Sequence, residues 1–120
     1  MKSFVKNELP VIKKENASGG KGYILIKRLL DETELNGKCG LYAQVTIPPG
    51  CSLGIHEHKG ESETYYILSG RGTYHDNGTD RPIGPGDVTF TPDGCTHGLD
   101  NTGDEDIVFM ALIIFDNLRS

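Results

Sequence analysis

The sequence lacks any hydrophobic run that could cross a membrane. Its longest apolar stretch lies within residues 107–115, whereas a transmembrane helix needs about 20 apolar residues. The N-terminal residues MKSFVKNELP also lack the apolar segment of a secretory signal peptide. We therefore expect a cytoplasmic protein that does not associate with membranes.

Positive charge is scarce as well. The chain has 12 Lys and Arg against 17 Asp and Glu, which gives a net charge of -5. Basic residues are adjacent only in Lys13–Lys14 and Lys27–Arg28. Binding to nucleic acid needs clustered basic side chains that neutralise phosphates. The composition therefore argues against a nucleic-acid partner, and the absence of a helix-turn-helix pattern argues against a transcriptional regulator in one chain.

Cysteine is rare, and its spacing excludes two classes of site. Cys39, Cys51 and Cys95 are odd in number and form no Cys-x-x-Cys pair, so neither a zinc ribbon nor a dithiol redox motif is indicated. In a reducing compartment we expect three free thiols.

Helical periodicity is also missing, whereas turn residues are abundant. Sixteen glycines and six prolines punctuate the chain, which favours many short strands in an antiparallel sandwich or barrel. Residues 1–120 are expected to form one domain with an N-terminal extension over 1–22 that ends in a flexible connection. Residues 31–38 are expected to form a polar turn. Strands are expected at 23–30, 40–47, 52–57, 64–68, 72–75, 88–91, 97–99 and 107–115.

Three histidines and a glutamate form a candidate metal site. His56 and His58 are two residues apart, so on a strand their side chains point to the same face. Glu63 begins the next expected strand, and His97 follows the turn at 92–94. Imidazole and carboxylate ligands suit Fe, Mn, Co, Ni, Cu or Zn, and four ligands leave positions open for a small molecule. A His-x-His pair by itself is more often a surface or pocket feature than a metal site.

The joint spacing of these residues resembles the cupin superfamily. The first cupin motif is matched over 50–70 and the second over 86–101. The matching patterns are Gly50-x5-His56-x-His58-x4-Glu63-x6-Gly70 and Gly86-x5-Pro92-x-Gly94-x2-His97-x3-Asn101. The resemblance implies an all-β jelly-roll barrel, the double-stranded β-helix, with antiparallel sheets. It also implies one divalent transition metal on His56, His58, Glu63 and His97, with Mn or Fe favoured and Zn, Ni, Co or Cu possible.

Residues next to the motifs are candidates for further roles. Counting alternation from Glu63, Tyr65 and Ile67 should point inward and Tyr66 outward. Tyr65 is therefore a candidate proton donor or substrate anchor, although an aromatic that fills the barrel with its hydroxyl at the rim is the commoner role for such a residue. His75 reads as a surface residue beside a turn, and Asn101 is expected to bond to backbone.

Function is less constrained than fold, because cupin barrels carry many activities. The sequence resembles small single-domain cupins related to the oxalate decarboxylase branch, but the acid that those enzymes carry on a mobile loop is not identifiable here. The first hypothesis is a metalloenzyme acting on a small carboxylate or carbonyl compound by dioxygenase- or decarboxylase-like chemistry. The alternatives are a binding or sensing module for a small molecule, and a sugar or sugar-phosphate isomerase. A homodimer is expected, because the segment 107–115 is apolar on both faces.

Overall fold

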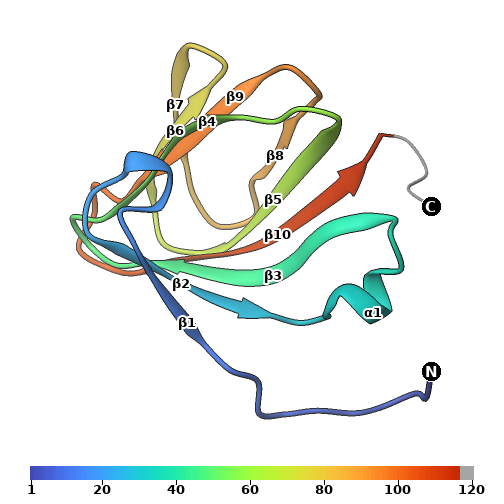
Figure 1. The fold of residues 1–120 in the computed structure, drawn as a ribbon. Coiled ribbons are helices and arrows are strands. Elements are labelled where there is room, and N and C mark those ends of the chain that lie inside the picture. Colours follow the sequence, from blue (N-terminus) through green and yellow to red (C-terminus); the bar gives the residue numbers. More distant parts are fainter. Residues whose placement is uncertain (117–120) are drawn as a thin grey trace.

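The computed structural model describes residues 1–116, which form two antiparallel sheets facing each other (Figure 1). One sheet has the order β1-β2-β3-β10-β5-β8 and the other β4-β9-β6-β7. The strands are β1 (Ile12–Glu15), β2 (Tyr23–Arg28), β3 (Cys39–Ile47), β4 (Ser52–Glu57), β5 (Glu61–Ser69), β6 (Gly72–Asp76), β7 (Thr79–Ile83), β8 (Val88–Thr91), β9 (Thr96–Asp100) and β10 (Ile107–Phe115). The all-β jelly-roll expected from the sequence is confirmed.

The sequence prediction missed two strands, β1 and β7, and both are edge strands. All four residues of β1 are exposed, as are four of the five in β7. An edge strand of this kind carries no alternation of apolar and polar residues, so its pattern does not reveal it. Residues 1–22 are thus more than an extension, since β1 pairs with β2 and a 3-10 turn η1 (Ala17–Gly19) follows it.

The region 31–38, expected to be a polar turn, contains one helical turn, α1 (Glu32–Leu35). Asp31 and Glu34 form a reciprocal capping box at its start, and Asn36 ends it in the left-handed conformation. Such local bonding favours a single turn of helix even without an apolar face. No helix among residues 1–116 is long and apolar enough to span a membrane.

The core lies between the sheets and follows the alternation of the strands. On β10, Ile107, Phe109 and Ala111 are buried, whereas the intervening Val108 and Met110 are only half-buried. On β5, Tyr65 and Ile67 point inward and Tyr66 is exposed, as the sequence predicted. Strand β10 lies between β3 and β5 and pairs with both. The inward-facing residues of these three strands therefore lie side by side beneath the site described below.

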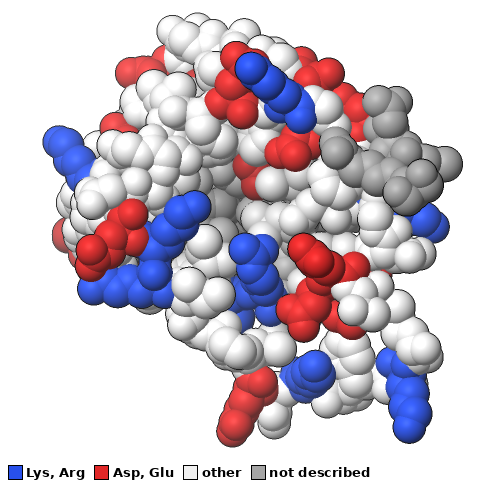
Figure 2. Space-filling model, in the orientation of Figure 1, with Lys and Arg blue, Asp and Glu red and all other residues white. Residues whose placement is uncertain are grey.

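Asn101 ties the end of β9 to the rest of the barrel. Its side-chain amide donates hydrogen bonds of 2.8 Å to the Ile47 carbonyl and 2.7 Å to the Glu105 carbonyl. Its oxygen accepts a 3.0 Å bond from the Gly103 amide. The expectation that Asn101 bonds to backbone is confirmed. Acidic and basic side chains are interspersed on the face of the molecule in Figure 2, so that face carries no extended basic patch.

His75 lies within β6, as expected, but it is half-buried rather than a surface residue, and it joins three strands of the smaller sheet. Its Nδ1–H donates to Asp80 Oδ1 on β7 at 2.6 Å, and its Nε2–H donates to Asp100 Oδ2 on β9 at 3.0 Å. Carboxylates only accept hydrogen bonds, so both nitrogens carry protons. The hydrogen bond to Asp80 is the main cause that raises the pKa of His75 above its ordinary 6.5, with Asp100 adding to it against a smaller effect of burial.

This arrangement predicts a pH-dependent contribution to stability. Because the pKa of His75 is higher in the folded than in the unfolded state, protonation of His75 stabilises the fold. This contribution is complete below the unfolded pKa of 6.5, and it is lost as pH rises through the pKa of the folded state. We expect His75→Gln to lower the free energy of unfolding more at about pH 5.5 than at about pH 8.5. Urea unfolding of both proteins at the two pH values measures this. An equal loss of unfolding free energy at the two pH values would contradict the conclusion that both ring nitrogens of His75 carry protons.

Candidate metal centre

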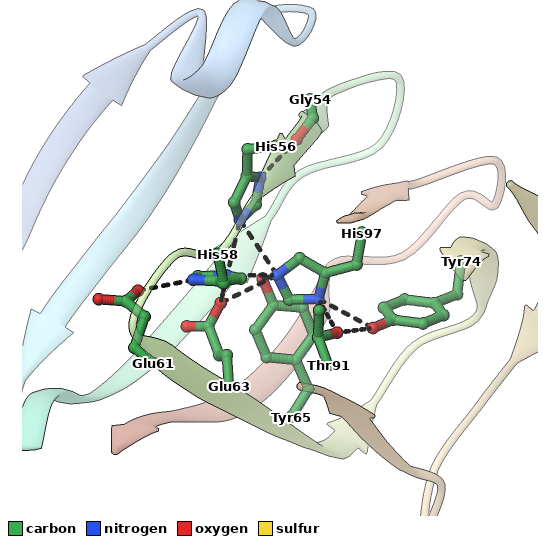
Figure 3. A network of polar contacts seen from close by, with 9 residues as sticks. All are labelled: Gly54, His56, His58, Glu61, Glu63, Tyr65, Tyr74, Thr91 and His97. Atoms are coloured by element: carbon green, nitrogen blue, oxygen red, sulfur yellow. Dashed lines mark hydrogen bonds and ion pairs between the residues drawn. The ribbon is translucent and has the colours of Figure 1, made fainter. Parts of the chain in front are cut away.

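The structure brings His56, His58, Glu63 and His97 together between the two sheets (Figure 3). His56 is on β4, and His58 follows directly after this strand. His97 is on the neighbouring β9, where it is the register partner of His56. Glu63 comes from β5 of the opposite sheet. His58, Glu63 and His97 are buried and His56 is half-buried, so the group lies at the base of an opening.

The donor atoms of these four side chains converge on one point. His97 Nε2 lies 2.9 Å from His58 Nε2, 3.0 Å from His56 Nε2 and 3.0 Å from Glu63 Oε1. His58 Nε2 lies 2.9 Å from Glu63 Oε1, and His56 Nε2 lies 3.9 Å from it. All four atoms are within 4.8 Å of one another.

A second set of contacts orients the imidazole rings. His56 Nδ1–H donates to the Gly54 carbonyl at 2.8 Å, and His58 Nδ1–H donates to Glu61 Oε2 at 2.6 Å. These acceptors place the proton on Nδ1, so in the neutral ring Nε2 presents its lone pair to the centre. His97 Nδ1 lies 2.8 Å from the Tyr74 hydroxyl and 2.9 Å from Thr91 Oγ1.

Sequence reasoning did not find Glu61, Tyr74 and Thr91. They come from three different strands, β5, β6 and β8, and reach the histidines only through the register of the barrel. Of these three residues, only Glu61 is close in sequence to a candidate ligand, three residues after His58. That spacing alone does not indicate a contact between the two side chains.

The electrostatics of the cluster favour an ionised carboxylate among imidazoles. Burial by itself raises the pKa of Glu63, but contacts with the imidazoles of His56, His58 and His97 outweigh it and hold that pKa far below its usual range. Burial lowers the pKa of His97. The contact with the Glu63 carboxylate, supported by Glu61 and opposed by burial, raises the pKa of His58.

The donor set fits a divalent transition metal. Nitrogen and oxygen ligands about 2.1 Å from a common ion lie about 3.0 Å apart when they meet at right angles, and about 3.4 Å apart in a tetrahedron. Four donor pairs, at 2.9–3.0 Å, match the first value, whereas His56 Nε2 and Glu63 Oε1, at 3.9 Å, are farther apart. Three imidazoles and one carboxylate could therefore hold a metal ion with further coordination positions, and each residue offers one ligand atom.

A cavity of about 220 Å³ opens beside the cluster. His56, His58 and Glu63 lie in its wall together with Tyr65. Its other walls are mostly apolar: Ala17, Ile24, Ile26, Leu41, Val45, Leu53, Phe109, Ala111 and Ile113. Only two further polar side chains, Lys14 and Ser18, complete its described lining.

Tyr65, the candidate proton donor, borders both the cluster and this cavity. Its ring stacks on His97 with centroids 4.7 Å apart, and its hydroxyl lies 3.3 Å from His97 Nε2. Burial raises its pKa well above 10, and the nearby Glu63 carboxylate adds to this effect. The phenol is therefore protonated at neutral pH. The hydroxyl is buried at the site, not at the rim of the barrel.

The fold and the cluster define the class of protein: a small antiparallel barrel with a possible mononuclear metal site in its interior. Residues 43–115 match the family model described as Cupin domain. The chain belongs to the cupin family.

Named relatives agree with this assignment. The chain is 48% identical over 99 residues to a Thermotoga maritima protein named oxalate-binding protein, and the match covers 82% of each chain. It is 31% identical over 107 residues to oxalate decarboxylase OxdC of Bacillus subtilis; that match covers 84% of this chain but 26% of the enzyme. A crystal structure described as a predicted oxalate decarboxylase from Thermotoga maritima superposes with a TM-score of 0.88 at 45% identity, covering 90% of this chain and 94% of the other.

Proposed function

We propose that this chain holds one divalent transition metal on His56, His58, Glu63 and His97 and binds a small carboxylate there, with oxalate as the first compound to test. The observation that carries the proposal is the convergence of three Nε2 atoms on one carboxylate, with each Nδ1 already engaged elsewhere. When bound, the metal supplies a Lewis acid with positions open to carboxylate oxygens. The donor spacings of 2.9–3.0 Å are compatible with octahedral coordination of manganese or iron.

The size and charge of the cavity support a small anion. Its volume of about 220 Å³ is below the range of roughly 300–1,000 Å³ typical of sites for larger organic ligands. A divalent ion beside the ionised Glu63 leaves one positive charge in a mostly apolar enclosure, which favours an anion over a neutral compound. The names of the 48% and 31% identical relatives support oxalate among small carboxylates.

Binding without turnover is better supported than decarboxylation. Replacing a carboxylate by hydrogen requires a group that delivers a proton to carbon. Among the described residues that line the cavity, Glu63 is the one carboxyl group, and its three histidine partners hold it ionised. An enzyme acting on the same ligand is the second candidate, because the protonated Tyr65 hydroxyl lies at the cluster and could serve as the donor.

Metal analysis followed by calorimetry tests the proposal. Mass spectrometry of untagged protein, purified without chelator, should give about one equivalent of manganese or iron per chain. Oxalate titrated into manganese-loaded protein should then bind with one site, and metal-free protein should not bind it. Assays for formate, carbon dioxide and oxygen uptake during incubation separate a binder from an enzyme. Failure to take up metal after reloading would refute the metal site. Metal uptake without oxalate binding would refute oxalate as the ligand.

The isomerase alternative finds less support. A sugar phosphate needs several basic side chains in the pocket. Lys14 is the one Lys or Arg in the described wall of this cavity, and neither arginine near the motifs lies there. Arg81 forms an ion pair of 2.8 Å with Asp76 at the surface, and the Arg71 side chain lies against Gly84.

The homodimer expected from the sequence remains a proposal, supported by the outer face of the larger sheet. Four exposed apolar side chains lie on β5 and β8: Tyr66, Leu68, Val88 and Phe90. Tyr66 pairs with Val88 across the strands and with the half-buried Met110 on the other side. A contiguous apolar patch of this kind is typical of an interface between subunits. Size-exclusion chromatography with light scattering should give twice the mass of the chain, and a monomer mass would remove the idea.

A further inference from the structure

The N-terminal segment supplies the cavity with a cation. Lys14 lies on β1 and contributes to the cavity wall. In the register of β1 with β2, Lys14 is opposite Ile24. Directly opposed residues of an antiparallel pair project to the same face, and Ile24 is a buried wall residue of the cavity. Lys14 therefore belongs to the inner face of the larger sheet, at the mouth of the cavity.

Its neighbour Lys13 projects to the other face and has partners there. The Lys13 ammonium lies 3.7 Å from Glu15 Oε1 and 4.4 Å from the centre of the Tyr23 ring. Within the described residues, no carboxylate forms an ion pair with Lys14. The two adjacent lysines thus differ in two respects: Lys14 lines the cavity and has no ion-pair partner among residues 1–116, whereas Lys13 is outside the cavity and is paired with Glu15.

The segment that follows Lys14 is fixed on the strand that bears His56. The Lys21 amide donates to Ser52 Oγ at 2.8 Å, and the Ser52 amide donates to the Lys21 carbonyl at 2.9 Å. The Ser18 carbonyl packs so closely on Gly54 that a Cβ there would lie 2.0 Å from it. These contacts fix η1 on β4, and the pairing with β2 fixes β1, so the backbone of Lys14 has a defined place relative to the candidate metal ligands.

The charge balance of the cavity indicates what Lys14 does. A divalent metal with ionised Glu63 and neutral imidazoles carries one net positive charge. A monoanion brings this sum to zero, whereas a dianion leaves one negative charge in a mostly apolar enclosure, which is unfavourable without a counter-charge. Apart from the histidines, Lys14 is the one cationic side chain in the described wall of the cavity.

We infer that Lys14 is a specificity-determining residue that selects small dianions, such as dicarboxylates, over monocarboxylates at the candidate metal centre. This inference rests on the proposed function. Lys14 is exposed and is not among the residues that could hold the metal, so its role concerns the second negative charge of the ligand and not metal binding.

Calorimetry on the manganese-loaded full chain tests the inference, with oxalate as the dianion and acetate as the monoanion. Lys14→Gln should weaken oxalate binding about fivefold to tenfold, as expected for loss of one partly exposed charge contact. Its affinity for acetate should stay within about twofold of wild type. Manganese affinity should be unchanged, and the difference between Lys14→Gln and wild type for oxalate should shrink as salt is raised.

Lys13→Gln is the matched control, since it removes the same charge one residue away and should bind oxalate like wild type. Lys14→Arg should retain most of the oxalate affinity, because the charge is kept. Equal effects of Lys13→Gln and Lys14→Gln, or an equal loss for acetate and oxalate, would overturn the inference while the proposed function stands. A wild-type protein that loads manganese but does not bind oxalate would overturn both.

Discussion

Replacing His58 with alanine is expected to lower manganese occupancy from about one equivalent to below about a tenth under the same loading conditions. The substitution removes one of four donors, whose Nε2 lies 2.9 Å from both His97 Nε2 and Glu63 Oε1. It also leaves the Glu61 carboxylate without the imidazole N–H that it accepts at 2.6 Å. Mass spectrometry after dialysis against trace manganese measures the occupancy.

Two further variants make the result specific. Glu61→Gln keeps a hydrogen-bond acceptor for His58 Nδ1 but removes its charge, so we expect a smaller loss of manganese affinity, about tenfold. His75→Ala removes a histidine outside the cluster and should leave occupancy at the wild-type level. Full manganese occupancy in His58→Ala would show that the four residues are not the ligand set.

The metal should also stabilise the fold. At a free manganese concentration about a hundred times the dissociation constant, binding to the native state alone adds about 2.7 kcal/mol. The melting temperature of the wild type should therefore rise on adding manganese, and that of His58→Ala should not. The same four residues would then account for both occupancy and stability.

The parts of the site that the sequence predicted are those whose spacing is local. His56 and His58 share a strand face because of their separation by two residues, and Tyr65 points inward by the same alternation from Glu63. His97 is far away in sequence, and the motif resemblance rather than any local rule placed it with the others. In the structure the donor atoms of all four side chains lie within 4.8 Å of one another.

The parts that the sequence missed depend on register and on edge strands. Tyr74 and Thr91 reach His97 Nδ1 only because β6 pairs with β9 and β5 pairs with β8. No periodicity in a single strand encodes such pairings. Lys14 was noted only as part of a basic pair, because β1 is exposed throughout and has no pattern that marks it as a cavity wall.

Three aromatic rings in successive contact link the hydrophobic core to the candidate metal centre. Phe109 on β10 is fully buried and contacts Tyr65 with ring centroids 4.4 Å apart. Tyr65 in turn stacks on His97 at 4.7 Å. Since Phe109 also lines the cavity, it supports the inner wall of the site without offering a ligand atom.

Replacing Phe109 with alanine should therefore cost about 3–5 kcal/mol of unfolding free energy, because it removes a buried ring and leaves a void. The melting temperature should fall by roughly 15 °C. Urea and thermal unfolding in the presence of a chelator measure this without any contribution from metal. Phe4→Ala is the control, since Phe4 is 44% exposed and outside both sheets, and it should cost under about 1 kcal/mol. If the two variants lost similar stability, Phe109 would not be the support on which Tyr65 and His97 rest.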